Sequence, residues 1–193
     1  LSLAVSLPVS VSQVARLMSE VFCEMVFING FVHCDPHPGN FAFRADGSVV
    51  AYDFGGIRSY SDSEVQLFKR FAKHAIRSDV TALEQDLIAL DIRKVDDKEV
   101  PGEFYQKWLE IGLKPLSVPP YHVGEFDFSD SPIHHEAITQ MRSSLKYFGQ
   151  FQPSATTMML DRTVSGQYWN LVNLGVKIDL LPLVEQYLEM TIE

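Results

Sequence analysis

The feature that most constrains this chain is the spacing of two polar strings after an apolar, helix-like segment. The string FVHCDPHPGN occupies positions 31–40, and DFG occupies positions 53–55. Apolar side chains in residues 14–26 recur at three- and four-residue steps, which is typical of a buried helix ending near Gly30. The chain must therefore leave a buried helix through a tight polar loop and fold back quickly to present the second string.

The segment between the two strings carries the signal of a β-hairpin. In NFAFRADGSVVAYDF, Asp46-Gly47 separates two short runs that are rich in aromatic and β-branched residues. An Asp-Gly pair between such runs is a strong local indication of a tight turn between antiparallel strands. We therefore expect two short strands between the polar strings, with no other strand in the chain.

Helix-start signals indicate that most of the remaining chain is helical. Ser10 with Gln13 and Ser61 with Glu64 have the spacing of capping boxes, in which side chains satisfy the free amides of a helix start. Later helices are expected to begin near Ser78 or Asp79, Pro101, Ser131, Ser154 and Leu181. The predicted fold is mainly α with one small β-hairpin.

Composition and charge exclude several classes of protein. The 193 residues are 46% hydrophobic, which is enough for a substantial core, and the formal net charge of −9 argues against a nucleic-acid surface. Cys23 and Cys34 lack a CxxC spacing, so we expect reduced thiols and an intracellular location. Neither the apolar residues 1–11, which contain Pro8, nor the interrupted residues 21–32 are long enough to span a bilayer. Because Leu1 opens an apolar run, we expect the chain to be the interior of a longer polypeptide.

The polar loop at 31–40 has three interpretations. His33, Cys34, Asp35 and His37 are all metal-ligand types, but a structural zinc site needs four ligands, usually in two spaced pairs. Taken alone, a structural turn shaped by its prolines and by Gly39 is the simpler interpretation. The distance to the second string favours a catalytic loop over both.

That distance reproduces a known catalytic pattern. His33-x-Asp35, Asn40 five positions on, and Asp53-Phe54-Gly55 match the protein-kinase order H-x-D-x-x-x-x-N followed by D-F-G. Phosphoryl transfer requires a positioned nucleophile and bound cations more than covalent chemistry by the protein. The pattern therefore predicts a phosphoryl-transfer centre in a protein-kinase-like C-lobe.

Each residue type suits one role in such a centre. Asp35 would orient the attacking hydroxyl or accept its proton, and Asn40 and Asp53 would supply the oxygen ligands that Mg²⁺ prefers. His33 would brace the loop, Phe54 would pack beneath it, and Gly55 would allow the sharp turn. His37 and Gly39 are assigned to the structure of the loop, and residues 40 and 53–55 to cofactor binding.

The strings HCDPHPGN and YDFGG resemble the UbiB/AarF group of atypical protein-kinase-like proteins, whose signature adds Pro-His-Pro-Gly to the kinase loop. The resemblance is specific over residues 30–56 and extends more weakly through the helical remainder, including LDRTVSGQYWNL at 160–171. It implies that residues 1–193 form a kinase-like C-lobe, with the catalytic loop at 31–40, the metal-binding DFG at 53–55 and a helical remainder at 61–193. The family's nucleotide-lid motifs do not occur in the chain, so we expect the N-lobe to be absent and the chain alone to bind nucleotide poorly and to be inactive.

The resemblance also carries expectations about function. Members of this group bind ATP with Mg²⁺, are associated with ubiquinone and other isoprenoid-lipid metabolism, and work at membranes of bacteria, mitochondria or plastids. It thus implies peripheral membrane association, lipid-biosynthesis enzyme partners and homodimers. Only residues 56–60 separate the DFG string from the next helix, and no A-P-E string follows, which favours a small-molecule or lipid-linked substrate over a protein.

Two alternatives remain open at this stage. Aminoglycoside- and choline-type phosphotransferases also use H-x-D-x-x-x-x-N with a later aspartate, although their second motif usually lacks the DFG form. A catalytically dead pseudokinase could instead use the helices as a scaffold that recruits other enzymes. Loss of ATP turnover on substitution of Asp53 would separate an enzyme from a scaffold.

Overall fold

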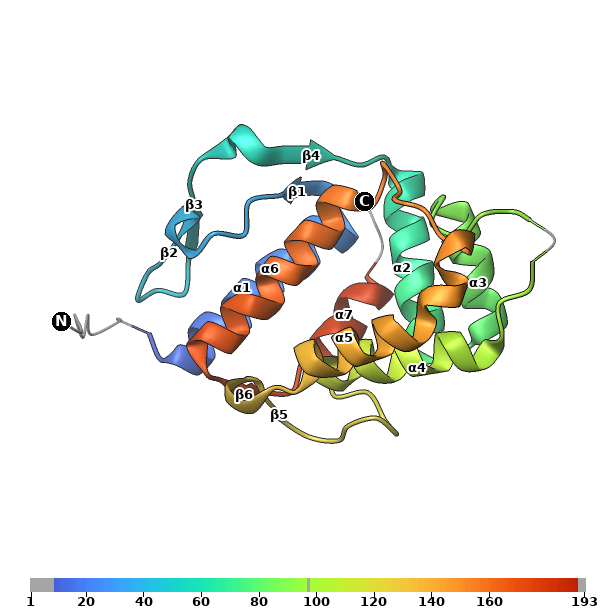
Figure 1. Cartoon of the computed structure of the whole chain (residues 1–193). Coiled ribbons are helices and arrows are strands. Elements are labelled where there is room, and N and C mark those ends of the chain that lie inside the picture. Colours follow the sequence, from blue (N-terminus) through green and yellow to red (C-terminus); the bar gives the residue numbers. More distant parts are fainter. Residues whose placement is uncertain (1–8, 97, 191–193) are drawn as a thin grey trace.

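The computed structural model describes residues 9–96 and 98–190, and in these ranges the chain is mainly helical (Figure 1). The α-helices are α1 (Val11–Glu24), α2 (Asp62–Ile76), α3 (Val80–Ala89), α4 (Gly102–Leu113), α5 (Ile133–Ser144), α6 (Met158–Leu174) and α7 (Leu181–Glu189). None of the described helices is both long enough and apolar enough to cross a bilayer. The apolar opening residues 1–8 lie outside the described ranges, so the expectation about the chain's start stays a prediction.

Six short strands pair in antiparallel couples within the described residues. The strands are β1 (Phe31–His33), β2 (Phe41–Phe43), β3 (Val49–Ala51), β4 (Ile57–Ser59), β5 (Phe126–Asp127) and β6 (Lys177–Ile178). β2 pairs with β3, β1 with β4, and β5 with β6. The predicted hairpin is confirmed as β2 and β3, whereas the other two couples correct the expectation that the chain has no further strands.

α1 begins and ends where its sequence signals indicate. The Ser10 side chain accepts from the amide of Gln13, and the Gln13 side chain accepts from the amide of Ser10, so both bonds of the predicted capping box are formed. The last turn widens into a π-helical segment, Met25–Asn29, and stops at Gly30, whose φ of 58° is left-handed. β1 begins at the next residue after Gly30.

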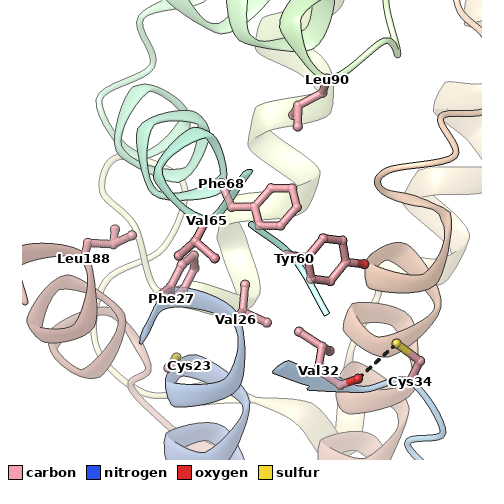
Figure 2. Packing of buried hydrophobic residues seen from close by; sticks show 10 residues of the cluster. All are labelled: Cys23, Val26, Phe27, Val32, Cys34, Tyr60, Val65, Phe68, Leu90 and Leu188. Carbon is pink, nitrogen blue, oxygen red and sulfur yellow. Dashed lines mark hydrogen bonds between the residues drawn. The ribbon is translucent and has the colours of Figure 1, made fainter. Parts of the chain in front are cut away.

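The core beneath the polar loop gathers side chains from several elements. Its fully packed members are Cys23, Val26, Phe27, Val32, Cys34, Tyr60, Val65, Phe68, Leu90 and Leu188. Figure 2 shows these side chains converging from α1, β1, α2, α3 and α7. Burial raises the pKa of the Cys23 thiol to about 12, and Cys34 donates from its sulfur to the carbonyl of Val32. Both thiols are free and serve the packing beneath the loop.

The helical remainder forms the body on which the loop rests. Ser61 and Glu64 form the second predicted capping box at the start of α2, and Asp79 caps α3. α5 is shorter than predicted, because residues 145–150 continue as a 3₁₀ segment, and α6 begins at Met158 rather than near Ser154. α6 lies beside α1, and the β1–β4 pair lies along this helical pair (Figure 1). The prediction of a mainly α fold with a small hairpin is confirmed.

Candidate functional site

The two polar strings lie side by side because β1 and β4 pair. The register joins His33 to Ile57, and just beyond it the Cys34 amide donates to the carbonyl of Gly56 over 2.8 Å. We call residues 33–40 the polar loop and residues 53–55 the DFG turn. Pairing on both sides of these segments fixes the start of the polar loop against the end of the DFG turn.

Asp35 and Asn40 are joined directly. The Nδ2 group of Asn40 donates to Oδ2 of Asp35 over 2.8 Å and also approaches the Asp35 carbonyl oxygen at 3.3 Å. The Asp35 side chain keeps 39% of its surface exposed, so a substrate can reach its carboxylate. Asn40 therefore orients Asp35 while leaving the carboxylate open to solvent.

Asp53 lies next to Asn40 through the backbone of the hairpin. The amide of Tyr52 donates to the Asn40 carbonyl over 2.8 Å, which places Asp53 one residue beyond that bond. Asp53 has φ 54° and ψ 70°, a left-handed conformation that costs energy in a residue with a Cβ atom. Strain of this kind collects at functional sites, where surrounding bonds hold it in place. The structure thus brings Asp35, Asn40 and Asp53 to one edge of the hairpin.

His33 ties the polar loop to the DFG turn from below. Its ring is buried, with 3% of the residue exposed. Nε2 lies 2.9 Å from the carbonyl oxygen of Tyr52, and Nδ1 accepts from the Asp35 amide at 3.3 Å. These two bonds assign the neutral tautomer with the proton on Nε2. Through it, His33 connects the residue before Asp53 with the backbone of Asp35, which is the geometry a bracing role requires.

His37 and Gly39 shape the outer part of the polar loop. Nδ1 of His37 accepts from the amide of Gly39 at 3.1 Å and so begins the short 3₁₀ turn Pro38–Asn40. A Cβ atom on Gly39 would lie only 3.0 Å from that same nitrogen. His37 is exposed and its partner is local, so the contacts are those of a loop-shaping residue.

Two details of the DFG turn differ from expectation. Phe54 does not pack beneath the loop: 61% of it is exposed, and its ring only borders that of His33, with centroids 6.0 Å apart. The left-handed residue is Asp53 and not Gly55, whose amide donates to Asp53 Oδ1 at 3.3 Å. The turn takes its positive φ two residues earlier than expected, and the side chain of Phe54 is exposed instead of packed in the core.

α6, which is distant in the sequence, contacts the polar loop. The spacing of the two polar strings could not reveal this contact. The Asn170 side chain, buried with 6% exposed, donates from Nδ2 to the Pro36 carbonyl over 2.8 Å. A Cβ atom at Gly166 would overlap the ring of Pro36. Arg162, one turn earlier, places Nη2 3.6 Å from Oδ1 of Asp35. The signal in the sequence is an arginine, a glycine and an asparagine spaced four residues apart on one helical face.

Beneath the loop lies a group of polar atoms without protein partners. The hydroxyl of Tyr60 and Nε of Arg58 are buried and make no hydrogen bond within the described residues. Burial raises the pKa of Tyr60, and burial likewise raises the pKa of Asp161, which accepts from the Thr157 hydroxyl at 3.1 Å. The Arg58 guanidinium lies 5.3 Å from the centre of the Tyr60 ring, a cation–π distance.

The residues at the loop edge suit Mg²⁺. Because the Asn40 amide nitrogen is engaged by Asp35, its oxygen is the atom left to coordinate a cation. Asp53 contributes a carboxylate that accepts from the nearby Gly55 amide. Among the described residues no three His, Cys, Asp or Glu side chains group closely enough to hold a metal ion. A site of one carboxylate and one amide suits Mg²⁺, which keeps water and takes phosphate oxygens as further ligands.

Residues 4–87, which include both polar strings, match the family model described as the ABC1 atypical kinase-like domain. The predicted kinase-like relationship is confirmed for this segment. An AarF domain-containing protein kinase 1 of Xenopus tropicalis is 33% identical over 92 residues, which cover 45% of this chain and 15% of the frog protein.

Other similarities extend this ABC1-type relationship. The chloroplastic protein ACTIVITY OF BC1 COMPLEX KINASE 7 of Arabidopsis thaliana is 43% identical over 59 residues, covering 31% of this chain and 8% of that protein. The chain thus spans only a small part of the curated relatives it matches. The Rv3197–erythromycin complex structure from Mycobacterium tuberculosis superposes with a TM-score of 0.64 at 16% identity, over 92% of this chain and 43% of that one. The fold of this chain is thus shared with that structure well beyond the residues that match the ABC1 model.

Proposed function

We propose that this chain carries the phosphoryl-transfer centre of an ATP- and Mg²⁺-dependent kinase or ATPase of the ABC1/AarF type. The observation that supports the proposal most strongly is the bonded arrangement of the polar loop and the DFG turn. Asn40 contacts the Asp35 carboxylate through its side chain and the Tyr52 amide through its backbone. Asn40 thus links Asp35, the proposed base, to Tyr52, the residue before the proposed metal ligand Asp53.

Each residue of this arrangement has a part in the proposed reaction. Bound Mg²⁺ would neutralise charge on the phosphates of the nucleotide. The Asp53 carboxylate and the Asn40 amide oxygen would hold that cation, and the Gly55 amide, which donates to Oδ1 of Asp53, holds the carboxylate in place. Asp35 would orient the acceptor hydroxyl and take up its proton, while His33 keeps the backbone of Asp35 aligned.

The segment after the DFG turn favours a small-molecule or lipid-linked acceptor, or ATP hydrolysis coupled to another process. β4 follows the DFG turn almost at once and is held against β1, and Ser61 then caps α2. A protein substrate of an ordinary protein kinase docks on a longer segment at this place. Since no such segment separates Gly56 from Ser61, a peptide would find little surface beside Asp35.

The biological setting is part of the proposal. By analogy with the AarF and ABC1 relatives, we assign the activity to ubiquinone or other isoprenoid-lipid metabolism, with lipid-biosynthesis enzymes as partners. An Arabidopsis relative is named chloroplastic, which supports a plastid as one setting for such proteins, beside mitochondria and bacterial membranes. Homodimerisation and peripheral membrane association complete the proposal. The match to the ABC1 model favours this assignment over an aminoglycoside- or choline-type phosphotransferase.

The test is Mg²⁺-dependent ATP turnover by the complete natural gene product that contains these residues. We expect Asp53→Asn to lower kcat by roughly 100-fold, because the substitution removes the charge that holds the cation. Asp62→Asn, at the exposed first turn of α2, is the matched control and should leave kcat unchanged. Turnover in Asp53→Asn equal to that of the natural protein would contradict the metal role. Absence of turnover in the natural protein, with partner capture retained, would favour a scaffold.

A further inference from the structure

A basic side chain beside Asp35 comes from α6 and not from the polar loop itself. The polar loop, HCDPHPGN, contains no lysine or arginine. Phosphoryl transfer needs positive charge near the transferred group in addition to the metal, because charge spreads over the oxygens of that group in the transition state. Because the polar loop does not provide this charge, another element must place a basic side chain close to Asp35, where the transferred group would lie.

Arg162 is placed to do so. Its Nη2 atom lies 3.6 Å from Oδ1 of Asp35, whereas the other carboxylate oxygen, Oδ2, accepts from Asn40. Within the described ranges, Arg162 makes no ion pair with any other residue. At 3.6 Å the contact is too long for a hydrogen bond, so the guanidinium keeps its donors for another acceptor.

The pairing with Asp35 contributes little to the stability of the fold. The Arg162 side chain is 61% exposed and that of Asp35 39% exposed. Solvent screens exposed ion pairs of this kind, and they contribute little to the stability of a fold. Stabilisation of the fold therefore does not explain why Arg162 lies beside Asp35, the proposed base.

The rest of the helical face fixes Arg162 in position. Gly166 brings α6 so close to the Pro36 ring that no larger side chain fits there, and Asn170 donates to the Pro36 carbonyl from a buried position. These two contacts, one and two helical turns beyond Arg162, lock α6 onto the residue that follows Asp35. These contacts fix the position of the Arg162 backbone, while its side chain is 61% exposed.

From this geometry we infer that Arg162 binds the transferred phosphoryl group beside Asp35, with Gly166 and Asn170 as positioning residues. The inference rests on the proposed function. In the step, the acceptor hydroxyl oxygen forms a bond to the γ-phosphorus, and the bond from that phosphorus to the bridging oxygen breaks. The electron pair leaves with ADP, and the hydroxyl proton passes to Asp35. Arg162 donates hydrogen bonds to the non-bridging oxygens during the transfer.

The ground-state ion pair then has a function of its own. Before substrate binds, Arg162 rests near the Asp35 carboxylate; when the phosphoryl group arrives, its oxygens replace that carboxylate as the partner of the guanidinium. Arginine suits this exchange, because its planar donors match both carboxylate and phosphate oxygens. Lysine would keep the charge without the paired donors.

The experiment compares Arg162→Gln, Arg162→Lys and the control Arg142→Gln in the complete natural gene product. Arg142 is an exposed arginine in the last turn of α5. We expect Arg162→Gln to lower kcat by roughly 100-fold, Arg162→Lys to recover part of that loss, and Arg142→Gln to leave kcat unchanged. Because Arg162 is exposed, the melting temperature of all three variants should stay close to that of the natural protein.

A binding measurement separates this inference from the proposed function. Mg²⁺-ADP and Mg²⁺-ADP with aluminium fluoride, which imitates the transferring phosphoryl group, serve as probes in calorimetric titrations. Arg162→Gln should weaken the fluoride complex at least tenfold and leave the affinity for Mg²⁺-ADP unchanged. Equal affinities of the variant and the natural protein for the fluoride complex would overturn the role of Arg162 alone. A natural protein that binds neither probe would overturn the proposed function and this inference with it.

Discussion

Gly30 shows how a single residue determines where the polar loop begins. Its φ of 58° ends the π-helical turn, and its carbonyl accepts from the Tyr60 amide over 2.7 Å. A Cβ atom there would lie 2.8 Å from the Tyr60 carbonyl oxygen and 2.9 Å from Cγ2 of Val65. Both the backbone conformation and the available space therefore require glycine at this position.

Substituting Gly30 should cost much more than substituting a glycine with the same handedness in open space. We expect Gly30→Ala to lower the free energy of unfolding by about 3 kcal/mol, because strain and a backbone clash add together. Gly47, with φ 84° at the tip of the hairpin and no atom within 4 Å of a built Cβ, is the matched control. Gly47→Ala should cost about 1 kcal/mol, from conformational strain alone.

Chemical denaturation of both variants measures this difference. Equal destabilisation by the two substitutions would show that the contact of Gly30 with Tyr60 and Val65 is not tight. The sequence predicted the helix stop at Gly30 from the end of the apolar periodicity, but the clash could not be predicted, because Tyr60 is thirty residues away.

At the scale of elements, α2 and α3 are joined by a buried carboxylate. Asp86 on α3 has 1% of its surface exposed, and its two oxygens lie 2.5 Å from Nε of Arg70 and 2.6 Å from Nδ1 of His74. Both partners belong to α2. A buried carboxylate held by two donors contributes mainly by avoiding unpaired polar groups inside the fold.

Removing this carboxylate should destabilise the fold. Asp86→Ala is expected to lower the free energy of unfolding by about 1.5 kcal/mol, because His74 loses its partner in a half-buried position whereas Arg70, with 55% of its side chain exposed, can turn to solvent. Glu103→Ala is the control, since Glu103 pairs with Lys107 on the surface of α4, where solvent screens the ion pair and its loss should change stability little. Thermal unfolding of the two variants distinguishes them, and similar melting temperatures would contradict the assigned role of Asp86.

The helix starts and the hairpin were predictable from local sequence signals, whereas two of the strand pairs were not. Both capping boxes and the Asp-Gly hairpin were predicted correctly, since each depends on residues within a few positions of one another. The pairs β1–β4 and β5–β6 were missed because, unlike β2 and β3, their short strands are not joined by a tight turn with its own sequence signal. Their partners are set by contacts distant in the chain.

At the scale of the whole molecule, the candidate site combines what spacing predicts with what only the fold provides. The spacing predicts that Asp35, Asn40 and Asp53 gather at one site, and the bonds of the fold join Asn40 to Asp35 and to Tyr52, the residue before Asp53. The arrival of α6 at Pro36, more than 120 residues later, depends on how the helices pack, and the spacing of Arg162, Gly166 and Asn170 marks a helical face without saying what that face contacts. The direction of Phe54 was also outside the reach of the sequence, because it follows from the positive φ of Asp53.

The most direct test of the metal assignment uses Mn²⁺ as a paramagnetic substitute for Mg²⁺. In NMR spectra of the chain, Mn²⁺ should broaden the amide signals of Asp35, Asn40 and Asp53 at the lowest added concentration, and Asp53→Asn should abolish that broadening. Broadening that begins elsewhere on the acidic surface, for example around Asp96, with the signals of the polar loop and the DFG turn unchanged, would contradict the proposed metal site.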